Sequence, residues 1–280
     1  MSFLPIGPCC VKGHELIGTP RGIIEPISPT RTVGRYHTKP SNGEIVDDKT
    51  ALVIFYDAFG FNLPNSKILA DTYADKLGLN VYVVDYIPSP LPHKVVDGVV
   101  PSYPQEHAQK SYFTRFKDFL GMLWIIPYIP GVMNGRILPL VKQGVDEIKH
   151  EGYERIGAVG YCRGGSMIIH LLSTGDASPL ECGVICHPGP ESKAVFGGIT
   201  KPTLWACASE DSFFNEKLRE DIRQTLGGKQ ADGVEFHMEV YPETTHGFAA
   251  RPNFDHEPTK KAFEQVGEES VAFLKKHLIG

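Results

Sequence analysis

Strand-like and helix-like patterns of apolar residues alternate along most of this 280-residue chain. Continuous apolar runs, typical of strands buried on both faces of a parallel sheet, occupy residues 51–57, 80–86, 155–162, 182–187 and 202–209. A further strand is expected at residues 234–242, and helical spacing is found in residues 65–78, 135–150, 166–173, 215–226 and 258–278. Repeated strand–helix units with short connections predict an α/β fold, with a mostly parallel central sheet covered by helices on both faces.

Two segments depart from this alternation. Residues 1–30 are irregular and proline-containing, and residues 87–135 are rich in proline and aromatic residues. Since no linker or repeat divides the chain, we expect one domain over residues 1–280, in which segment 87–135 lines or covers a ligand site. The longest apolar stretch, residues 119–132, is too short and too interrupted by prolines to span a bilayer, which predicts a buried flap or cap.

The composition narrows the range of partners. The net charge of −5 gives no global positive field, so neither nucleic acid nor a membrane is an expected partner. The chain shows no secretory signal and its six cysteines form no C-x-x-C pair, which predicts reduced thiols in a cytoplasmic protein without zinc. Nucleotide-binding and metalloprotease motifs are missing, so we expect no cofactor and a small-molecule substrate. A monomer and a homodimer are both compatible with these features.

The stretch "VGYCRGGS", residues 159–166, places Cys162 between a predicted strand and a predicted helix. G-x-C-x-G is the pattern of a nucleophile elbow with sulfur in place of oxygen. Gly160 and Gly164 are needed in such a turn because side chains there would clash with the neighbouring strand and helix, and the helix N-terminus favours a thiolate. The motif alone also fits a small apolar residue in an ordinary glycine-rich loop.

Two further residues favour catalysis. Asp211 and His246 each follow a predicted strand, so with Cys162 they converge on the carboxyl edge of the sheet in the order nucleophile, acid, histidine. In that arrangement His246 accepts and returns the thiol proton, and Asp211 fixes the orientation of the imidazole. His187 also follows a strand but precedes the acid, so a structural hydrogen bond is its expected role.

The chain resembles the dienelactone hydrolases of the α/β-hydrolase superfamily. The resemblance is carried by "YDAFGFN", "VVDY", "GYCRGG", "ASED" and "HGFAAR", and the N-terminal "CCVKGHELIGTPRGIIEPI" is similar to the leader of the fungal branch. It implies an α/β-hydrolase fold and hydrolysis of a lactone or carboxylic ester through a Cys-His-Asp triad and a thioester intermediate.

The resemblance also implies roles for four residues outside the triad. Asp57 matches a carboxylate, usually glutamate, that helps to activate the thiol once substrate is bound; the alternative is a cap of the turn after its strand. The backbone N–H groups of Ala58 and Arg163 match an oxyanion hole. The long side chain of Arg163 is unusual at its position, and either binds a substrate carboxylate or points to solvent. Arg251 matches an arginine that holds a substrate carboxylate, with an ordinary surface arginine as the alternative.

One departure from the family pattern bears on the substrate. Ile87 and Pro88 stand where a second carboxylate-binding arginine is expected, which favours a more apolar ester or lactone. Four aromatic residues suit an apolar pocket, although packing explains them equally well: Tyr112, Phe116, Trp124 and Tyr128.

Two other functions stay open at this point. One is a carboxylesterase or thioesterase with the same machinery and a more apolar pocket. The other is a redox-responsive binding protein in which Cys162 senses rather than hydrolyses. The presence of Asp211 and His246 argues against the redox-responsive binding protein, because a sensor needs no orienting acid.

Overall fold

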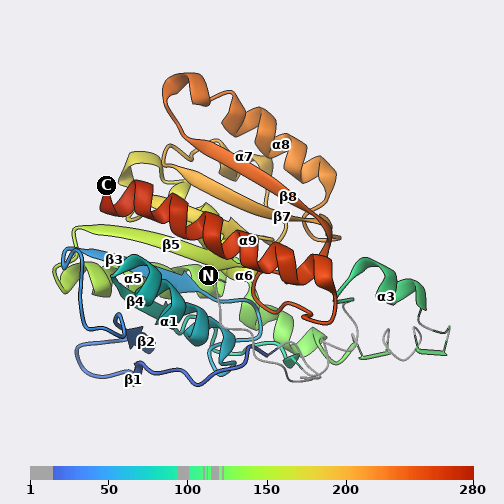
Figure 1. The fold of residues 1–280 in the computed structure, drawn as a ribbon, viewed down its shortest axis with the longest axis horizontal. Coiled ribbons are helices and arrows are strands. Elements are labelled where there is room, and N and C mark those ends of the chain that lie inside the picture. The colour runs from blue at the N-terminus through green and yellow to red at the C-terminus, as the bar shows by residue number, and fades with distance from the viewer. Residues whose placement is uncertain (1–14, 94–100, 110, 112, 115–119, 122) are drawn as a thin grey trace.

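A twisted sheet forms the centre of the computed structural model, which describes residues 15–93, 101–109, 111, 113–114, 120–121 and 123–280 (Figure 1). Its eight strands lie in the order β1-β2-β4-β3-β5-β6-β7-β8. Pairing is parallel from β4 to β8 and antiparallel where β1 and β2 are added at one edge. The strands are Ile23–Glu25 (β1), Arg35–Thr38 (β2), Thr50–Phe55 (β3), Asn80–Val84 (β4), Arg155–Tyr161 (β5), Cys182–Cys186 (β6), Thr203–Glu210 (β7) and Phe236–Thr245 (β8).

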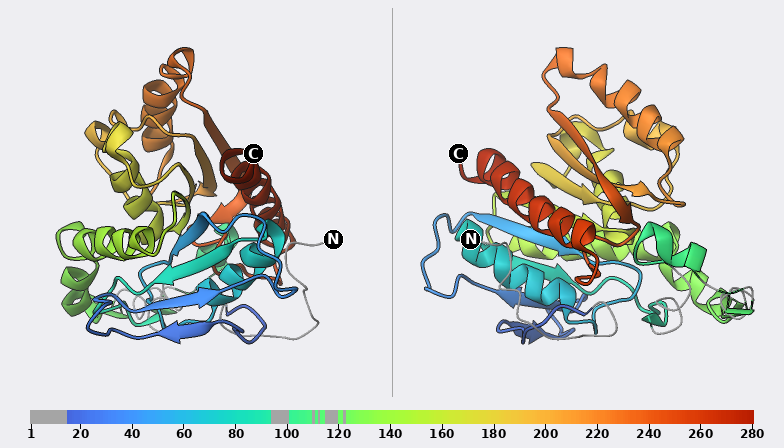
Figure 2. Two further views of the ribbon diagram at one scale, coloured as in Figure 1. Left: turned by 90° about the vertical axis from the view of Figure 1, so that its left-hand side faces the viewer. Right: turned by 45° about the vertical axis from the view of Figure 1, so that its right-hand side comes forward.

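Helices cover both faces of the sheet. Figure 2 shows α1 and α9 on one face and α5, α6 and α8 on the other. The helices are Asn65–Leu77 (α1), Pro104–Gln109 (α3), Asn134–His150 (α5), Arg163–Leu172 (α6), Lys193–Phe196 (α7), Glu216–Gly227 (α8) and Glu257–Leu274 (α9), with short turns at Ile126–Val132 (η1), Gly175–Ala177 (η2), Gln230–Asp232 (η3) and Lys275–Ile279 (η4). This architecture confirms the predicted α/β class.

The local sequence explains these elements. Every residue of β3, β4 and β6 is buried, as their continuous apolar runs predict for strands covered on both faces. Helix α1 ends at Gly78, whose left-handed φ of 69° is accessible to glycine at no steric cost. In α5, Ile137, Val141 and Ile148 form a buried stripe at helical spacing.

The sequence patterns missed the first two strands. β1 lies inside residues 1–30, which were expected to be irregular, and β2 carries the sequence RYHT, which has no apolar run. β1 is a short edge strand with exposed residues, where fewer apolar side chains are required. β2 is only four residues long and carries polar side chains although it is mostly buried between β1 and β4. Helix α6 begins at Arg163, three residues earlier than its pattern indicates, so it follows Cys162 directly.

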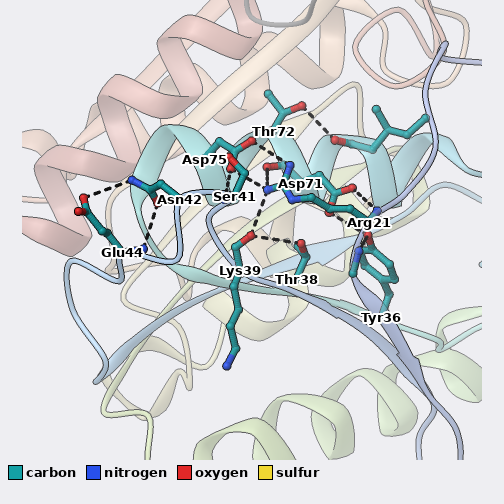
Figure 3. A network of polar contacts seen from close by, with 12 residues as sticks. Arg21, Tyr36, Thr38, Lys39, Ser41, Asn42, Glu44, Asp71, Thr72 and Asp75 are labelled. Carbon is teal, nitrogen blue, oxygen red and sulfur yellow. Dashed lines mark hydrogen bonds and ion pairs between the residues drawn. The ribbon is translucent and has the colours of Figure 1, made fainter.

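Polar contacts fasten the N-terminal segment to α1 (Figure 3). The Arg21 guanidinium donates to Asp75 at 2.7 and 2.9 Å and to the carbonyl oxygen of Asp71 at 2.9 Å. The Asp71 carboxylate in turn accepts from the backbone N–H of Arg21 and from the hydroxyl of Tyr36, at 2.9 and 2.8 Å. These contacts join β2 and the segment before β1 to the helix that covers β3 and β4.

The apolar stretch at residues 119–132, which was predicted to form a buried flap or cap, is mostly exposed where the structure describes it. Trp124 is 75% exposed and Tyr128 is 38% exposed, and neither lines the cavity described below; Tyr112 and Phe116 lie outside the described residues. Figure 1 shows α3 extending beyond the end of the sheet. The described helices include none long and apolar enough to cross a membrane.

Candidate active site

Cys162 stands on a sharp turn between β5 and α6. Its φ of 51° and ψ of −111° are unfavourable for a residue with a side chain. A Cβ atom on Gly160 would lie 2.4 Å from the carbonyl oxygen of Gly164, and one on Gly164 would lie 2.0 Å from that of Phe55. The predicted need for both glycines is therefore confirmed. Of the cysteines that the structure describes, Cys162 is half-buried, whereas Cys182, Cys186 and Cys207 are buried in strands.

The structure brings Asp211 and His246 to the same edge of the sheet as Cys162. Asp211 directly follows β7 and His246 directly follows β8. Nδ1 of His246 lies 2.8 Å from Oδ2 of Asp211. The other Asp211 oxygen accepts from the backbone N–H groups of Phe213 and Phe214 at 2.8 and 3.1 Å, which fixes the carboxylate.

The surroundings of His246 favour its charged form. Burial opposes the positive charge, but the negative charge of Cys162 and hydrogen bonds to Asp211 and Cys162 outweigh burial and raise the pKa of His246 to about 10. The sulfur, the imidazole and the carboxylate thus form a continuous chain of contacts. This arrangement can deliver a thiolate nucleophile and a proton donor to one bound molecule.

Asp57 and Arg251 form an ion pair beside the thiol. Nε of Arg251 donates to Oδ2 of Asp57 at 3.0 Å, and the guanidinium covers the ring of Phe59 at 3.9 Å from its centroid. Oδ1 of Asp57 accepts from the backbone N–H of Phe59 at 3.0 Å. Burial raises the pKa of Asp57, although the charge of Arg251 opposes that effect. Asp57 therefore caps its turn and also faces the site, whereas the interpretation of Arg251 as an ordinary surface arginine is wrong.

The side chain of Arg163 does not point to solvent, and protein groups surround its guanidinium. Its Nε donates to the carbonyl oxygen of Val132 at 2.7 Å, Nη2 donates to Oδ1 of Asn134, and Nη1 lies 3.8 Å from Oε1 of Glu191. Glu191 also lies 2.9 Å from Nε2 of His170. The guanidinium thus joins the elbow to the end of segment 87–135, which supplies a backbone carbonyl and a side-chain amide as acceptors.

A cavity of about 190 Å³ lies above these groups. Cys162 and His246 open into it, and so do Ala58 and Arg163, whose backbone N–H groups are the expected oxyanion hole. Much of the remaining wall is apolar and includes Phe59, Leu91, Pro190 and Phe213. Within the described part of the chain, histidine, cysteine and carboxylate side chains form no group that could hold a metal ion.

Comparison with known proteins identifies the family. The sequence model of the dienelactone hydrolase family matches residues 131–278, which is more than half of the chain. The chain belongs to the dienelactone hydrolase family. It is 25% identical to "Hydrolase pyvD" of Aspergillus violaceofuscus over 99% of both proteins, and 26% identical to "Dienlactone hydrolase 1" of Gibberella moniliformis over 88% of this chain and 84% of that protein.

Solved structures show the same fold. A putative dienelactone hydrolase from Klebsiella pneumoniae superposes with a TM-score of 0.61 at 16% identity, covering 87% of this chain and 93% of that one. The dienelactone hydrolase family has the α/β-hydrolase fold, and the protein is an ester or lactone hydrolase of this kind.

One role expected in this dienelactone hydrolase is wrong. His187 makes no structural hydrogen bond: both ring nitrogens are buried without a partner among the described residues. Its ring instead stands edge-on to that of His246, with 5.1 Å between the ring centroids. The Phe213 ring also stands edge-on to His246, with 5.0 Å between centroids. Burial, with the charge of His246, lowers the pKa of His187 well below its ordinary value, so it contributes an uncharged ring.

Phe213 and Glu191 are among the residues in and around the site that were not found from the sequence. Phe213 is 48% exposed and lines the cavity, and its place two residues after Asp211 was the available signal. Glu191 had no such signal, because it follows a strand by several residues in an irregular loop.

Proposed function

We propose that this dienelactone hydrolase cleaves its ester or lactone by nucleophilic catalysis, with Cys162, His246 and Asp211 as the catalytic triad. The observation that supports the proposal is the convergence of the three side chains at the carboxyl ends of β5, β8 and β7, with hydrogen bonds from sulfur to imidazole and from imidazole to carboxylate. Such a chain of contacts is what activation of a nucleophile by a base and an orienting acid requires.

Acylation begins when the Cys162 sulfur attacks the substrate carbonyl carbon. A carbon–sulfur bond forms, and the carbonyl oxygen becomes an oxyanion that accepts from the backbone N–H groups of Ala58 and Arg163. Collapse of this intermediate breaks the carbon–oxygen bond of the ester. His246 protonates the leaving alkoxide, and the acyl group remains on Cys162 as a thioester.

Deacylation reverses the roles. The neutral imidazole of His246 takes a proton from water, and the resulting hydroxide attacks the thioester. The carbon–sulfur bond breaks, the acid leaves, and the proton taken from water stays on His246, so that the thiolate of Cys162 and the imidazolium of His246 are restored. Asp211 holds the imidazole in one orientation through both halves, because its own carboxylate is fixed by two backbone N–H groups.

A carboxylesterase acting on apolar substrates is the variant of this function that the cavity favours. Phe59, Leu91, Pro190 and Phe213 give an acyl or alcohol group apolar contact. We propose a small-molecule ester or lactone as the partner and a cytoplasmic site of action. Asp57 lines the same cavity as Cys162, and we propose that it assists activation of the thiol when its pairing with Arg251 loosens.

A chromogenic ester assay tests the triad. Wild type should turn over aryl esters, and Cys162→Ala should abolish turnover, whereas Cys182→Ala removes a buried thiol of β6 and should leave it measurable. Mass spectrometry of rapidly quenched wild type should detect an acyl group on Cys162. Cys162→Ser should remain folded and lose most of its rate, because the surroundings are tuned to a thiolate.

Two results would overturn this proposal. Undiminished turnover in Cys162→Ala would remove sulfur from the mechanism. A lack of turnover by wild type across a broad panel of esters and lactones would favour the redox-responsive binding protein, in which Cys162 is a sensor.

A further inference from the structure

Both arginines that line the cavity are paired with buried carboxylates. Arg251 contacts Asp57 at 3.0 Å, with 11% and 10% of the two side chains exposed. Arg163 lies 3.8 Å from Glu191, with 17% and 6% exposed. The remaining cation, the imidazolium of His246, faces the sulfur of Cys162 and the Asp211 carboxylate.

Further hydrogen bonds hold Arg163 and Glu191 in place, although Nη1 of Arg163 and Oε1 of Glu191 are 3.8 Å apart. Three acceptors from two separate segments of the chain surround the guanidinium: the carbonyl oxygen of Val132 and Oδ1 of Asn134 from one segment, and Glu191 from the other. Glu191 is held in turn by His170 at 2.9 Å and by Nδ2 of Asn134 at 3.4 Å. Burial opposes its charge, but the hydrogen bond and charge of His170 prevail and lower the pKa of Glu191, which therefore stays ionised.

Paired charges give the cavity little net attraction for an anion. A carboxylate that enters a site of this kind loses hydration, and only an unpaired cation or several donors can compensate for that loss. Here each guanidinium already faces a negative partner, so its field at the cavity is largely cancelled. An apolar, uncharged acyl group meets no such loss and gains contact with the apolar wall.

From these contacts we propose that the site selects uncharged esters and lactones, and that Glu191 enforces the selection by neutralising Arg163. The inference rests on the proposed function and adds the substrate class and a specificity-determining residue. Glu191 is the informative position because it does not line the cavity, unlike Asp57. Its replacement changes the charge facing Arg163 without removing a part of the wall.

The experiment compares two aryl esters of similar length, 4-nitrophenyl butyrate and mono-4-nitrophenyl glutarate, at pH 8 and low ionic strength. The measured quantity is the ratio of kcat/KM for the anionic ester to that for the neutral ester. Wild type should give a ratio well below one. Glu191→Gln keeps the size of the side chain and one acceptor oxygen, and should raise the ratio about tenfold, an increase that shrinks with added salt.

Two control variants isolate the charge of Arg163. Glu216→Gln removes the same charge from an exposed carboxylate that pairs with Arg219 on α8, away from the residues that line the cavity, and should leave the ratio unchanged. Arg163→Met/Glu191→Gln removes both partners, and should return the ratio to the wild-type value. A ratio that stays high in this double variant would overturn the role of Arg163.

Three further results decide the proposal. A folded Glu191→Gln variant with the wild-type ratio would overturn it, and so would a wild type that prefers the anionic ester. A wild-type ratio that falls steeply with salt would reveal an unpaired cation and also count against it, without any need for a variant to fold. Calorimetric binding of both esters to Cys162→Ala makes the same comparison without turnover, so failure of the proposed hydrolysis is distinguishable from failure of charge selection.

Discussion

The charge of His246 depends on the sulfur that faces it, and Cys162→Ala tests this dependence. The pKa of His246 is about 10, against an ordinary value of 6.5. That difference corresponds to roughly 5 kcal/mol in favour of the imidazolium, at about 1.4 kcal/mol for each pH unit. Burial acts in the opposite direction, so Cys162 and Asp211 together supply more than this net value.

Replacing the sulfur with a methyl group removes both its charge and its hydrogen bond. Burial of His246 is retained, and Asp211 remains to hold the proton. We expect the pKa of His246 to fall by at least about 2 pH units in Cys162→Ala, because the strongest contribution that raised it is gone. The imidazole of the variant should thus become neutral in a pH range where wild type still carries the charge.

Nuclear magnetic resonance of the histidine Cε1–H groups measures this titration directly. His246 is assigned by its loss in His246→Gln, and His187 is an internal control because its ring should stay neutral across the range. Cys182→Ala should leave the titration of His246 unchanged. A pKa that stays near 10 in Cys162→Ala would refute the ion pair between sulfur and imidazole.

Three stability predictions follow from the packing and capping of the chain. Gly164→Ala should lower the free energy of unfolding by at least about 3 kcal/mol or prevent folding, because its Cβ would lie 2.0 Å from the Phe55 carbonyl oxygen; Gly135→Ala, which meets nothing within 4 Å, is the control for urea denaturation. Arg21→Ala should cost about 1 kcal/mol and speed proteolysis of the N-terminal segment, and unchanged cleavage would contradict the contacts of Figure 3. Asn215→Ala should cost about 1 kcal/mol, measured by thermal unfolding, since its side chain caps α8.

The sequence was sufficient for those parts of the site that depend on local structure. The glycines around Cys162 are required by the turn itself, so their spacing predicts the elbow without knowledge of the rest of the fold. Asp211 and His246 each follow a strand directly, and parallel strands place their carboxyl ends at one edge of the sheet. Three residues that are distant in the chain could therefore be predicted to meet.

Polar pairing around the triad could not be predicted in the same way. Asp57 and Arg251 are 194 residues apart, and their ion pair depends on two loops approaching within 3.0 Å. The sequence assigned separate roles to them, toward the thiol and toward a substrate carboxylate. The partner that a guanidinium binds depends on all the acceptors within hydrogen-bonding distance. Those acceptors are known only when the positions of remote segments are known.

The surroundings of segment 87–135 could not be predicted from the sequence either. Its apolar composition predicts burial, yet Trp124 is exposed. Val132 and Asn134, at the end of the segment, accept hydrogen bonds from the Arg163 side chain. The sequence had predicted that this side chain binds substrate or points to solvent. Periodicity and turn chemistry, which act over a few residues, thus determined the fold class and the convergence of Cys162, Asp211 and His246. Burial and charge pairing act through space between distant segments, so tertiary structure alone decided the walls and the electrostatics of the cavity.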